Sequence, residues 1–310
     1  MKNSSKTILF FGNEKFATGI KTNLLALKAV LALGYQIPAI IVAQSEKNQN
    51  ETEIIDFAHK NNIKIINYTN NQELLNKIKT YNTKTALLAA YGKIIPTSIL
   101  NYFSNGIINI HPSLLPKHRG PTPIESVILN GEDKTGVSLI KLVPEMDQGP
   151  IFVQSQLDII PSITKQDLSD QLDQLAQTMI HDHLDNILGG KIIPMKQNDQ
   201  LASYDHKISK ADSILDPKKP AQTLEREVRA FTKWPKSRFI FNNLEFIVTK
   251  SSVVNKNGPI GKFYCGKNQF GIYTSKGTLM VHSIIPPGKQ EMDTVSFLAG
   301  YKTRLNFPQE

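Results

Sequence analysis

Residues 7–42 read TILFFGNEKFATGIKTNLLALKAVLALGYQIPAIIV, and the hydrophobic pattern of this stretch decides the fold. The run Thr7–Phe11 is short, apolar and rich in residues that favour strands, and Gly12 ends it. Leucine and alanine then recur at helical spacing over Asn23–Leu33, and Pro38–Val42 is again a short apolar run. A strand, a helix and a strand in this order predict parallel strands joined by a crossover helix.

The same alternation continues to about residue 190. Further strands are predicted at Ile63–Tyr68, Thr85–Ala90, Ile107–Ile110 and Val137–Val143, with an edge strand at Ile151–Ile160, and helices at Glu51–Asn61, Gln72–Tyr81, Pro123–Leu129 and Thr164–Leu188. This order predicts an α/β protein with a doubly wound, mostly parallel Rossmann-like sheet. The first strand ends in Gly12-Asn13-Glu14, which lacks the repeated glycines and the lysine of phosphate-binding loops. Neither a nicotinamide enzyme nor an ATP enzyme is therefore expected.

The pattern changes after residue 190. Gly189-Gly190 ends the long helix, and Lys191–Leu201 is polar and aperiodic, which indicates a linker. One more helix and five short strands are predicted beyond it, at Gln222–Phe231, Arg238–Phe241, Phe246–Val254, Gly261–Tyr264, Gly271–Thr274 and Thr278–Ile285. We therefore predict a domain over residues 1–190, a linker over 191–203 and a small OB-like β-barrel domain over 204–310.

Composition narrows the class of protein. The single cysteine, Cys265, precludes an internal disulfide and favours a reducing compartment. No apolar run is long enough for a leader sequence or a membrane span, so we expect a soluble cytoplasmic protein.

The formal charge of +9 is unevenly distributed along the chain. Residues 1–200 carry 19 basic and 18 acidic side chains, a net of +1, whereas residues 201–310 carry 17 and 9, a net of +8. A basic last third favours contact with a polyanion such as nucleic acid. The alternative is a lysine-rich surface that only keeps the protein in solution.

Three polar side chains lie at or just after the ends of predicted strands in the first domain. Asn109 and His111 are two apart on a strand and project from the same face, and Asp147 follows the next strand. In a sheet of this class, ligands bind beyond the carboxyl ends of the strands. The amide can stabilise an oxyanion, and the imidazole can stabilise the same charge or accept a proton from an amine. The carboxylate either raises the basicity of the imidazole or holds a water that relays the proton, and the set favours transfer of a small acyl group.

Metal and thiol chemistry are not expected. His181 and His183 lie two apart on a predicted helix, so they point to different faces and are predicted to be surface residues. Cys265 is predicted to be a core residue of the barrel. The sequence therefore predicts no metal site.

Several motifs resemble the 10-formyltetrahydrofolate-dependent formyltransferases. They are Asn109–Pro116 (NIHPSLLP), Arg119–Ile124 (RGPTPI), Thr135–Ser138 (TGVS) and Met146–Gly149 (MDQG). Residues 90–96 (AYGKIIP) are similar to the segment that this family has near the folate. Residues 229–235 (RAFTKWP) and 286–300 resemble the branch of the family that acts on methionyl-tRNA.

The resemblance implies specific roles. Asn109, His111 and Asp147 would be catalytic, and Ser113, Leu114, Leu115 and Pro116 would line the folate site. Lys207 and Lys210 would lie near the tRNA. The formyl donor would be 10-formyltetrahydrofolate, and the acceptor would be the α-amino group of initiator methionyl-tRNA, for translation initiation. A monomer with no membrane partner and no metal is expected.

One segment departs from the family pattern. The family has a long basic loop after the second strand, whereas Ala43–Glu53 contains one lysine, three glutamates and no arginine. A second hypothesis is therefore a formyltransferase of the same superfamily that acts on a nucleotide-linked amino sugar. A third is a non-catalytic RNA-binding protein, against which the intact set of Asn109, His111 and Asp147 argues.

Overall fold

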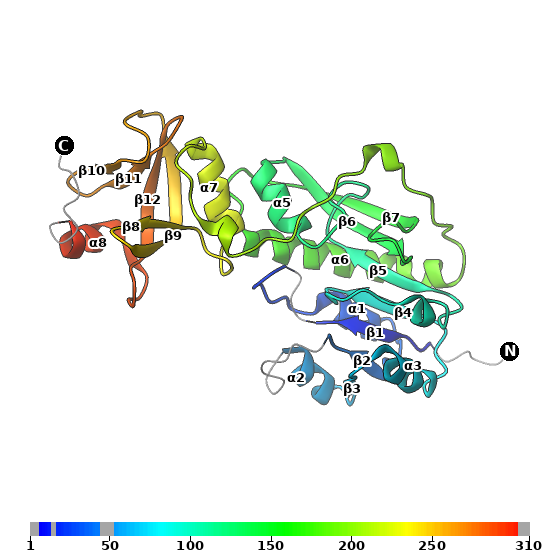
Figure 1. Ribbon diagram of the computed structural model, residues 1–310. Coiled ribbons are helices and arrows are strands. Elements are labelled where there is room, and N and C mark those ends of the chain that lie inside the picture. The colour runs from blue at the N-terminus through cyan, green and yellow to red at the C-terminus, as the bar shows by residue number, and fades with distance from the viewer. Residues whose placement is uncertain (1–5, 14–16, 44–52, 303–310) are drawn as a thin grey trace. The chain divides into compact units, whose positions relative to one another are not determined.

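A computed structural model describes residues 6–13, 17–43 and 53–302 of the chain (Figure 1). These residues form two compact units. The N-terminal unit comprises the described residues of 1–124, 133–159 and 167–206, and the C-terminal unit those of 125–132, 160–166 and 207–310. The domain and linker boundaries expected from the sequence remain predictions.

The N-terminal unit is built on a seven-stranded sheet with the strand order β3-β2-β1-β4-β5-β6-β7. The strands are β1 (Leu9–Gly12), β2 (Ala39–Ile41), β3 (Lys64–Ile66), β4 (Ala86–Ala89), β5 (Ile107–His111), β6 (Lys134–Lys141) and β7 (Ile151–Asp158). The first five pair in parallel, and β6 and β7 are antiparallel additions at one edge. The predicted doubly wound, mostly parallel sheet is confirmed.

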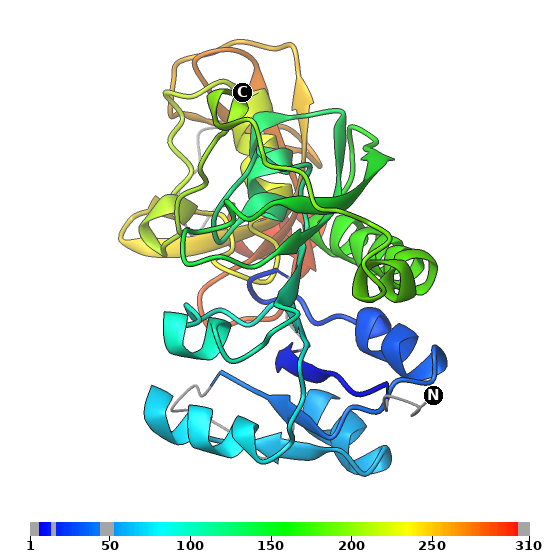
Figure 2. The ribbon, with the colours of Figure 1, turned by 90° about the vertical axis from the view of Figure 1, so that its right-hand side faces the viewer.

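Helices cover both faces of this sheet (Figure 2). The helices of this unit are α1 (Leu25–Ala32), α2 (Glu53–Lys60), α3 (Asn71–Lys79), α4 (Thr97–Leu100) and α6 (Lys165–Leu188), whereas most of α5 (Pro123–Asn130) belongs to the C-terminal unit. Buried side chains of α3 and α4 pack with alternate residues of the parallel strands. In α6 the buried residues Leu168, Leu172 and Ala176 recur every fourth position, as an amphipathic helix requires.

The C-terminal unit contains an antiparallel sheet with the order β10-β11-β12-β9-β8, curved as a half-barrel. Its elements are α7 (Ala221–Ala230), β8 (Arg238–Phe241), β9 (Leu244–Val254), β10 (Phe263–Cys265), β11 (Phe270–Tyr273), β12 (Thr278–Ile285), β13 (Met292–Asp293) and α8 (Thr294–Tyr301), with β13 paired to β12. Two short 3-10 helices precede them, at Asp199–Leu201 in the N-terminal unit and at Ala211–Ser213.

Aromatic side chains fill the core of the C-terminal unit. The ring centroids of Phe239 and Phe246 lie 5.2 Å apart, and those of Phe270 and Phe297 lie 5.3 Å apart. Such contacts contribute about 0.5–1.5 kcal/mol each beyond the burial of their area. Cys265 is buried in this core, and burial raises the pKa of its thiol to about 11, as expected for a core residue. Within the described parts of the chain, no helix combines the length and hydropathy needed to cross a membrane.

Candidate functional site

Strand β5 brings two of the predicted site residues into the middle of the N-terminal sheet. Asn109 pairs with Leu88 of β4 on one side and with Ile140 of β6 on the other, and His111 pairs with Ser138. Both polar side chains are buried, at 6% and 5% exposure. The amide of Asn109 makes no hydrogen bond to any residue that the structure describes, so it is available to a bound molecule.

The two ring nitrogens of His111 have different neighbours. Nε2 lies 2.8 Å from the backbone carbonyl oxygen of His118. A carbonyl can only accept, so Nε2 carries the proton in the neutral ring and Nδ1 has the lone pair. Nδ1 faces Asp147, with 3.7 Å between Nδ1 and Oδ1. The nitrogen that can take up a proton is therefore the one beside the carboxylate.

Asp147 reaches this position through a loop that folds back. Because β6 is antiparallel to β5, its last residue, Lys141, pairs with Ile108 and not with the carboxyl end of β5. The loop 142–150 then returns toward His111. Asp147 has a left-handed backbone with φ of 53°, and its Oδ2 accepts a 2.8 Å hydrogen bond from the backbone N–H of Gly120.

Two buried side chains hold the returning loop. The carboxamide of Gln197 donates to the backbone oxygens of Asp147 and Gly149, both at 2.7 Å. Its own oxygen accepts from Arg119, from Nε at 3.1 Å and from Nη2 at 2.8 Å. Gln197 and Arg119 are 5% and 1% exposed. We call this pair the loop brace, because it connects the loop of Asp147 to a segment fifty residues away in the sequence.

Two further residues hydrogen-bond to Arg119 of the loop brace. Burial disfavours the charge of Arg119, but hydrogen bonds with Asp199 and Tyr204, at 2.7 and 2.8 Å, raise the pKa of its guanidinium above the ordinary value. Arg119 is therefore charged at neutral pH, which makes its hydrogen bonds to Gln197 charge-assisted.

A second buried pair lies behind His111. The ring of His118 faces Asp205, with Nδ1 at 3.0 and 3.2 Å from the two carboxylate oxygens. His118 has a φ of 59°, and its carbonyl is the acceptor for His111. The contact between the His118 ring and Asp205 therefore supports the backbone conformation that presents this carbonyl.

The turn after β5 has two buried and two half-buried members. Ser113 and Leu115 are buried, and the Ser113 hydroxyl donates to the carbonyl of Lys117 at 2.8 Å. Leu114 and Pro116 are half-buried, so they are the two of the four side chains with accessible surface. Ser138 fixes the turn, since its hydroxyl donates to the Ser113 carbonyl at 2.6 Å.

The two remaining predicted residues belong to the other unit. Lys207 and Lys210 are exposed residues of the C-terminal unit, just before the 3-10 helix at 211–213. Of the shortened loop Ala43–Glu53, residues 44–52 fall outside the described part of the chain.

Sequence reasoning missed Gln197, Asp205 and the structural roles of His118 and Arg119. Gln197 lies in the predicted linker, whose polar composition gave no sign of burial. Arg119 stands in the RGPTPI motif, which by itself does not indicate a contact with Gln197. A buried arginine needs acceptors, and that requirement was the available clue.

Comparison with known proteins identifies the family. Residues 26–184 match the formyl transferase model, and residues 207–302 match the model of the formyl transferase C-terminal domain. The chain is 30% identical to the methionyl-tRNA formyltransferase of Sulfurihydrogenibium sp. over 310 residues, covering 96% of this chain and 97% of the relative. It is 36% identical to the enzyme of that name from Buchnera aphidicola over 237 residues, covering 75% and 76%.

A solved structure shares the fold. It is an N-formyltransferase from Helicobacter canadensis in complex with folinic acid and dTDP-3-aminofucose, with a TM-score of 0.68 and 20% identity, covering 89% of this chain and 98% of the other. Both family models together span most of the sequence, from the helical segment after the first strand to the last described helix. The chain belongs to the formyl transferase family.

Proposed function

We propose that the protein transfers the formyl group of 10-formyltetrahydrofolate to the α-amino group of initiator methionyl-tRNA. The observation that carries the proposal is the contact of His111 Nδ1 with Asp147, at the end of the strand that also presents Asn109, whose amide has no hydrogen-bond partner among the described residues. The names of the relatives at 30–36% identity support the tRNA acceptor, as does the basic C-terminal third.

The chemistry follows from the site. The neutral amine attacks the formyl carbon, and the carbonyl oxygen becomes an oxyanion to which the Asn109 amide can donate. His111 Nδ1 accepts the proton that the amine loses, and Asp147 stabilises the resulting imidazolium. Loss of the folate N10 from the tetrahedral carbon, with return of that proton to N10, completes the exchange of one C–N bond for another. An α-amino group has a pKa of about 7.7, so a neutral amine is available near neutral pH.

The folate donor would contact the turn after β5. Leu114 and Pro116 offer apolar surface, and the buried Ser113 and Leu115 keep the turn in shape. We propose that Lys207 and Lys210 contribute phosphate contacts. No metal is needed for this reaction, because the amide and the imidazole stabilise the developing charge.

The test is a formyl transfer assay with purified protein, 10-formyltetrahydrofolate and charged initiator tRNA. Removing the Asn109 amide by Asn109→Ala should lower kcat about 10²–10³-fold, as for other oxyanion donors. His111→Ala and Asp147→Ala should lower kcat at least as strongly, and the exposed His181→Ala is the matched control. Wild-type rates in all three site variants would sink the proposal.

The second candidate is formylation of a nucleotide-linked amino sugar. The fold shared with the Helicobacter canadensis enzyme favours it. The same assay with an amino-sugar nucleotide in place of tRNA decides between the two. Formylated sugar without formylated tRNA would replace the proposed acceptor, and no product with either acceptor would favour the non-catalytic RNA-binding hypothesis.

A further inference from the structure

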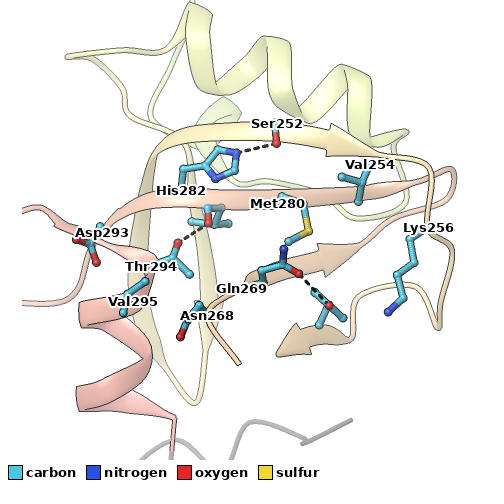
Figure 3. Close-up of a pocket in the computed structure, with 12 residues that line it drawn as sticks. Ser252, Val254, Lys256, Asn268, Gln269, Met280, His282, Asp293, Thr294 and Val295 are labelled. Carbon is cyan, nitrogen blue, oxygen red and sulfur yellow. Dashed lines mark hydrogen bonds between the residues drawn. The ribbon is translucent and has the colours of Figure 1, made fainter. Parts of the chain in front are cut away.

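The C-terminal unit has a hollow on the face of its sheet that is turned away from the aromatic core (Figure 3). Its volume is about 550 Å³, within the range of roughly 300–1,000 Å³ that is usual for small-ligand pockets. All of its lining residues belong to this unit, so it is distinct from the site around His111.

A glycine stands among the residues of this face of the sheet. Tyr264, Gly271, Met280 and Ser252 pair directly across β10, β11, β12 and β9, so their positions share one face. A Cβ atom added to Gly271 would lie 3.0 Å from the Met280 sulfur. The missing side chain therefore lets the Met280 thioether lie close over the β11 backbone, in the space that a Cβ atom at Gly271 would take.

The rim supplies donors and acceptors. The Tyr264 hydroxyl donates to the Gln269 carboxamide oxygen at 3.0 Å, which fixes that side chain with its nitrogen unpaired among the described residues. The carboxamide of Asn268 makes no hydrogen bond within the described part of the chain. His282 and Ser252 hydrogen-bond to each other at 2.7 Å, at the other side of Met280 (Figure 3).

The charges of the hollow are separated. Lys256 lies with its Nζ 4.1 Å from the centroid of the Tyr264 ring. Asp293 lies at the opposite end (Figure 3), and hydrogen bonds from Ser296 lower the pKa of its carboxyl, so it is ionised at neutral pH. A ligand with one anionic end and a planar polar body matches this arrangement. A polyphosphate does not, because only one cation lines the space and a carboxylate closes it.

We propose that this hollow binds a single unstacked nucleotide of the tRNA, with the base over Met280 beside Tyr264 and the phosphate toward Lys256. The carboxamides of Asn268 and Gln269 would meet the polar edge of the base, as in other single-stranded recognition by protein side chains. The net charge of +8 over residues 201–310 makes RNA the source of the nucleotide. The inference rests on the proposed tRNA substrate.

The first experiment maps the contact directly. The full-length protein is irradiated with ultraviolet light in the presence of deacylated initiator tRNA, digested with trypsin, and its cross-linked peptides are identified. A cross-link on residues 263–267, the peptide that contains Tyr264, is expected. Cross-links confined to peptides that contribute nothing to the hollow would overturn the inference.

The second experiment measures affinity for deacylated tRNA at fixed salt. Tyr264→Leu and Gln269→Ala should weaken binding, the former about tenfold, the size found for loss of base stacking. Lys256→Ala is matched with Lys267→Ala, an exposed lysine nearby that does not line the hollow. Equal losses for the two lysine variants, with unchanged affinity in Tyr264→Leu, would mean diffuse charge attraction and would overturn the inference.

The two proposals can fail separately. Formyl transfer by Lys267→Ala should retain the parent kcat, because Lys267 lines neither the hollow nor the site around His111. A protein that formylates tRNA but cross-links elsewhere retains the proposed function and loses the nucleotide pocket. A protein that binds tRNA at the hollow without formylating it loses the proposed function and retains the nucleotide pocket.

Discussion

Gln197→Glu tests whether the loop brace positions Asp147. The new carboxylate still accepts from Arg119, so the buried guanidinium keeps its partner. The two hydrogen bonds to the backbone oxygens of Asp147 and Gly149 are lost, because an ionised carboxylate has no proton to donate. The fold should therefore survive while the loop loses its attachment.

The size of the effect follows from the two bonds. Each is worth about 1 kcal/mol net, and the carbonyl oxygens left facing a carboxylate add a similar amount, giving roughly 2–3 kcal/mol in all. If the transition state loses all of this stabilisation, kcat/KM falls roughly 30- to 150-fold, because about 1.4 kcal/mol corresponds to a factor of ten in rate.

Formyl transfer kinetics and thermal unfolding are measured on the same preparations. Asp199→Asn is the matched control, since it removes a half-exposed partner of Arg119 and leaves the loop contacts intact. Its kcat/KM should stay within about twofold of the parent value, as exposed ion pairs contribute little. A brace that only stabilises the fold would lower the melting temperature of Gln197→Glu without a loss of kcat/KM that exceeds the control, and the positioning argument would be refuted.

Three further predictions concern charged groups. Burial raises the pKa of Asp173 from 3.8 to about 6, so its contribution to stability is present at pH below 3.8 and is lost as the pH rises through 6. Asp173→Asn should therefore raise the melting temperature at pH 7.5 by more than at pH 4; a pH-independent difference would contradict this. Lys165 and Glu125 form a buried pair at 3.5 Å, so Lys165→Met should destabilise by about 3–5 kcal/mol in denaturant titrations and the double variant with Glu125→Leu should recover most of the loss. No recovery would mean that packing, not charge, explains the single variant. Charge reversal at Lys207 and Lys210 should raise the KM for tRNA, more at low salt than at high salt, and leave kcat nearly unchanged; a salt-independent KM would argue against phosphate contacts.

The regular parts of the fold were predictable because each carries a local signal. Strand β12 was predicted over Thr278–Ile285 and has those bounds. Asn242 and Asn243 lie between two predicted strands, and both have positive φ, which asparagine adopts readily and a tight hairpin turn requires. Helix α4, over Thr97–Leu100, was not predicted, since four residues are too few to show a helical period.

The candidate site was predictable only in part. Asn109 and His111 share one strand, so their spacing carried the information. The partners that fix His111 and Asp147 come from positions as distant as Gln197 and Asp205, and no pattern in a single sequence reports a contact over such separation. The strand direction of β6 also mattered, because it decides that the loop of Asp147 has to return along the sheet.

The hydrogen-bond partner of His111 Nε2 is the backbone carbonyl oxygen of His118 and not a side chain. A carbonyl is common to all twenty amino acids, so replacing the side chain at position 118 leaves the acceptor for His111 Nε2 in place wherever the backbone keeps its φ of 59°. What a replacement of His118 removes is the contact of its ring with Asp205, which supports this backbone conformation. Asparagine and glycine, which adopt positive φ most readily, are the replacements expected to be accepted there.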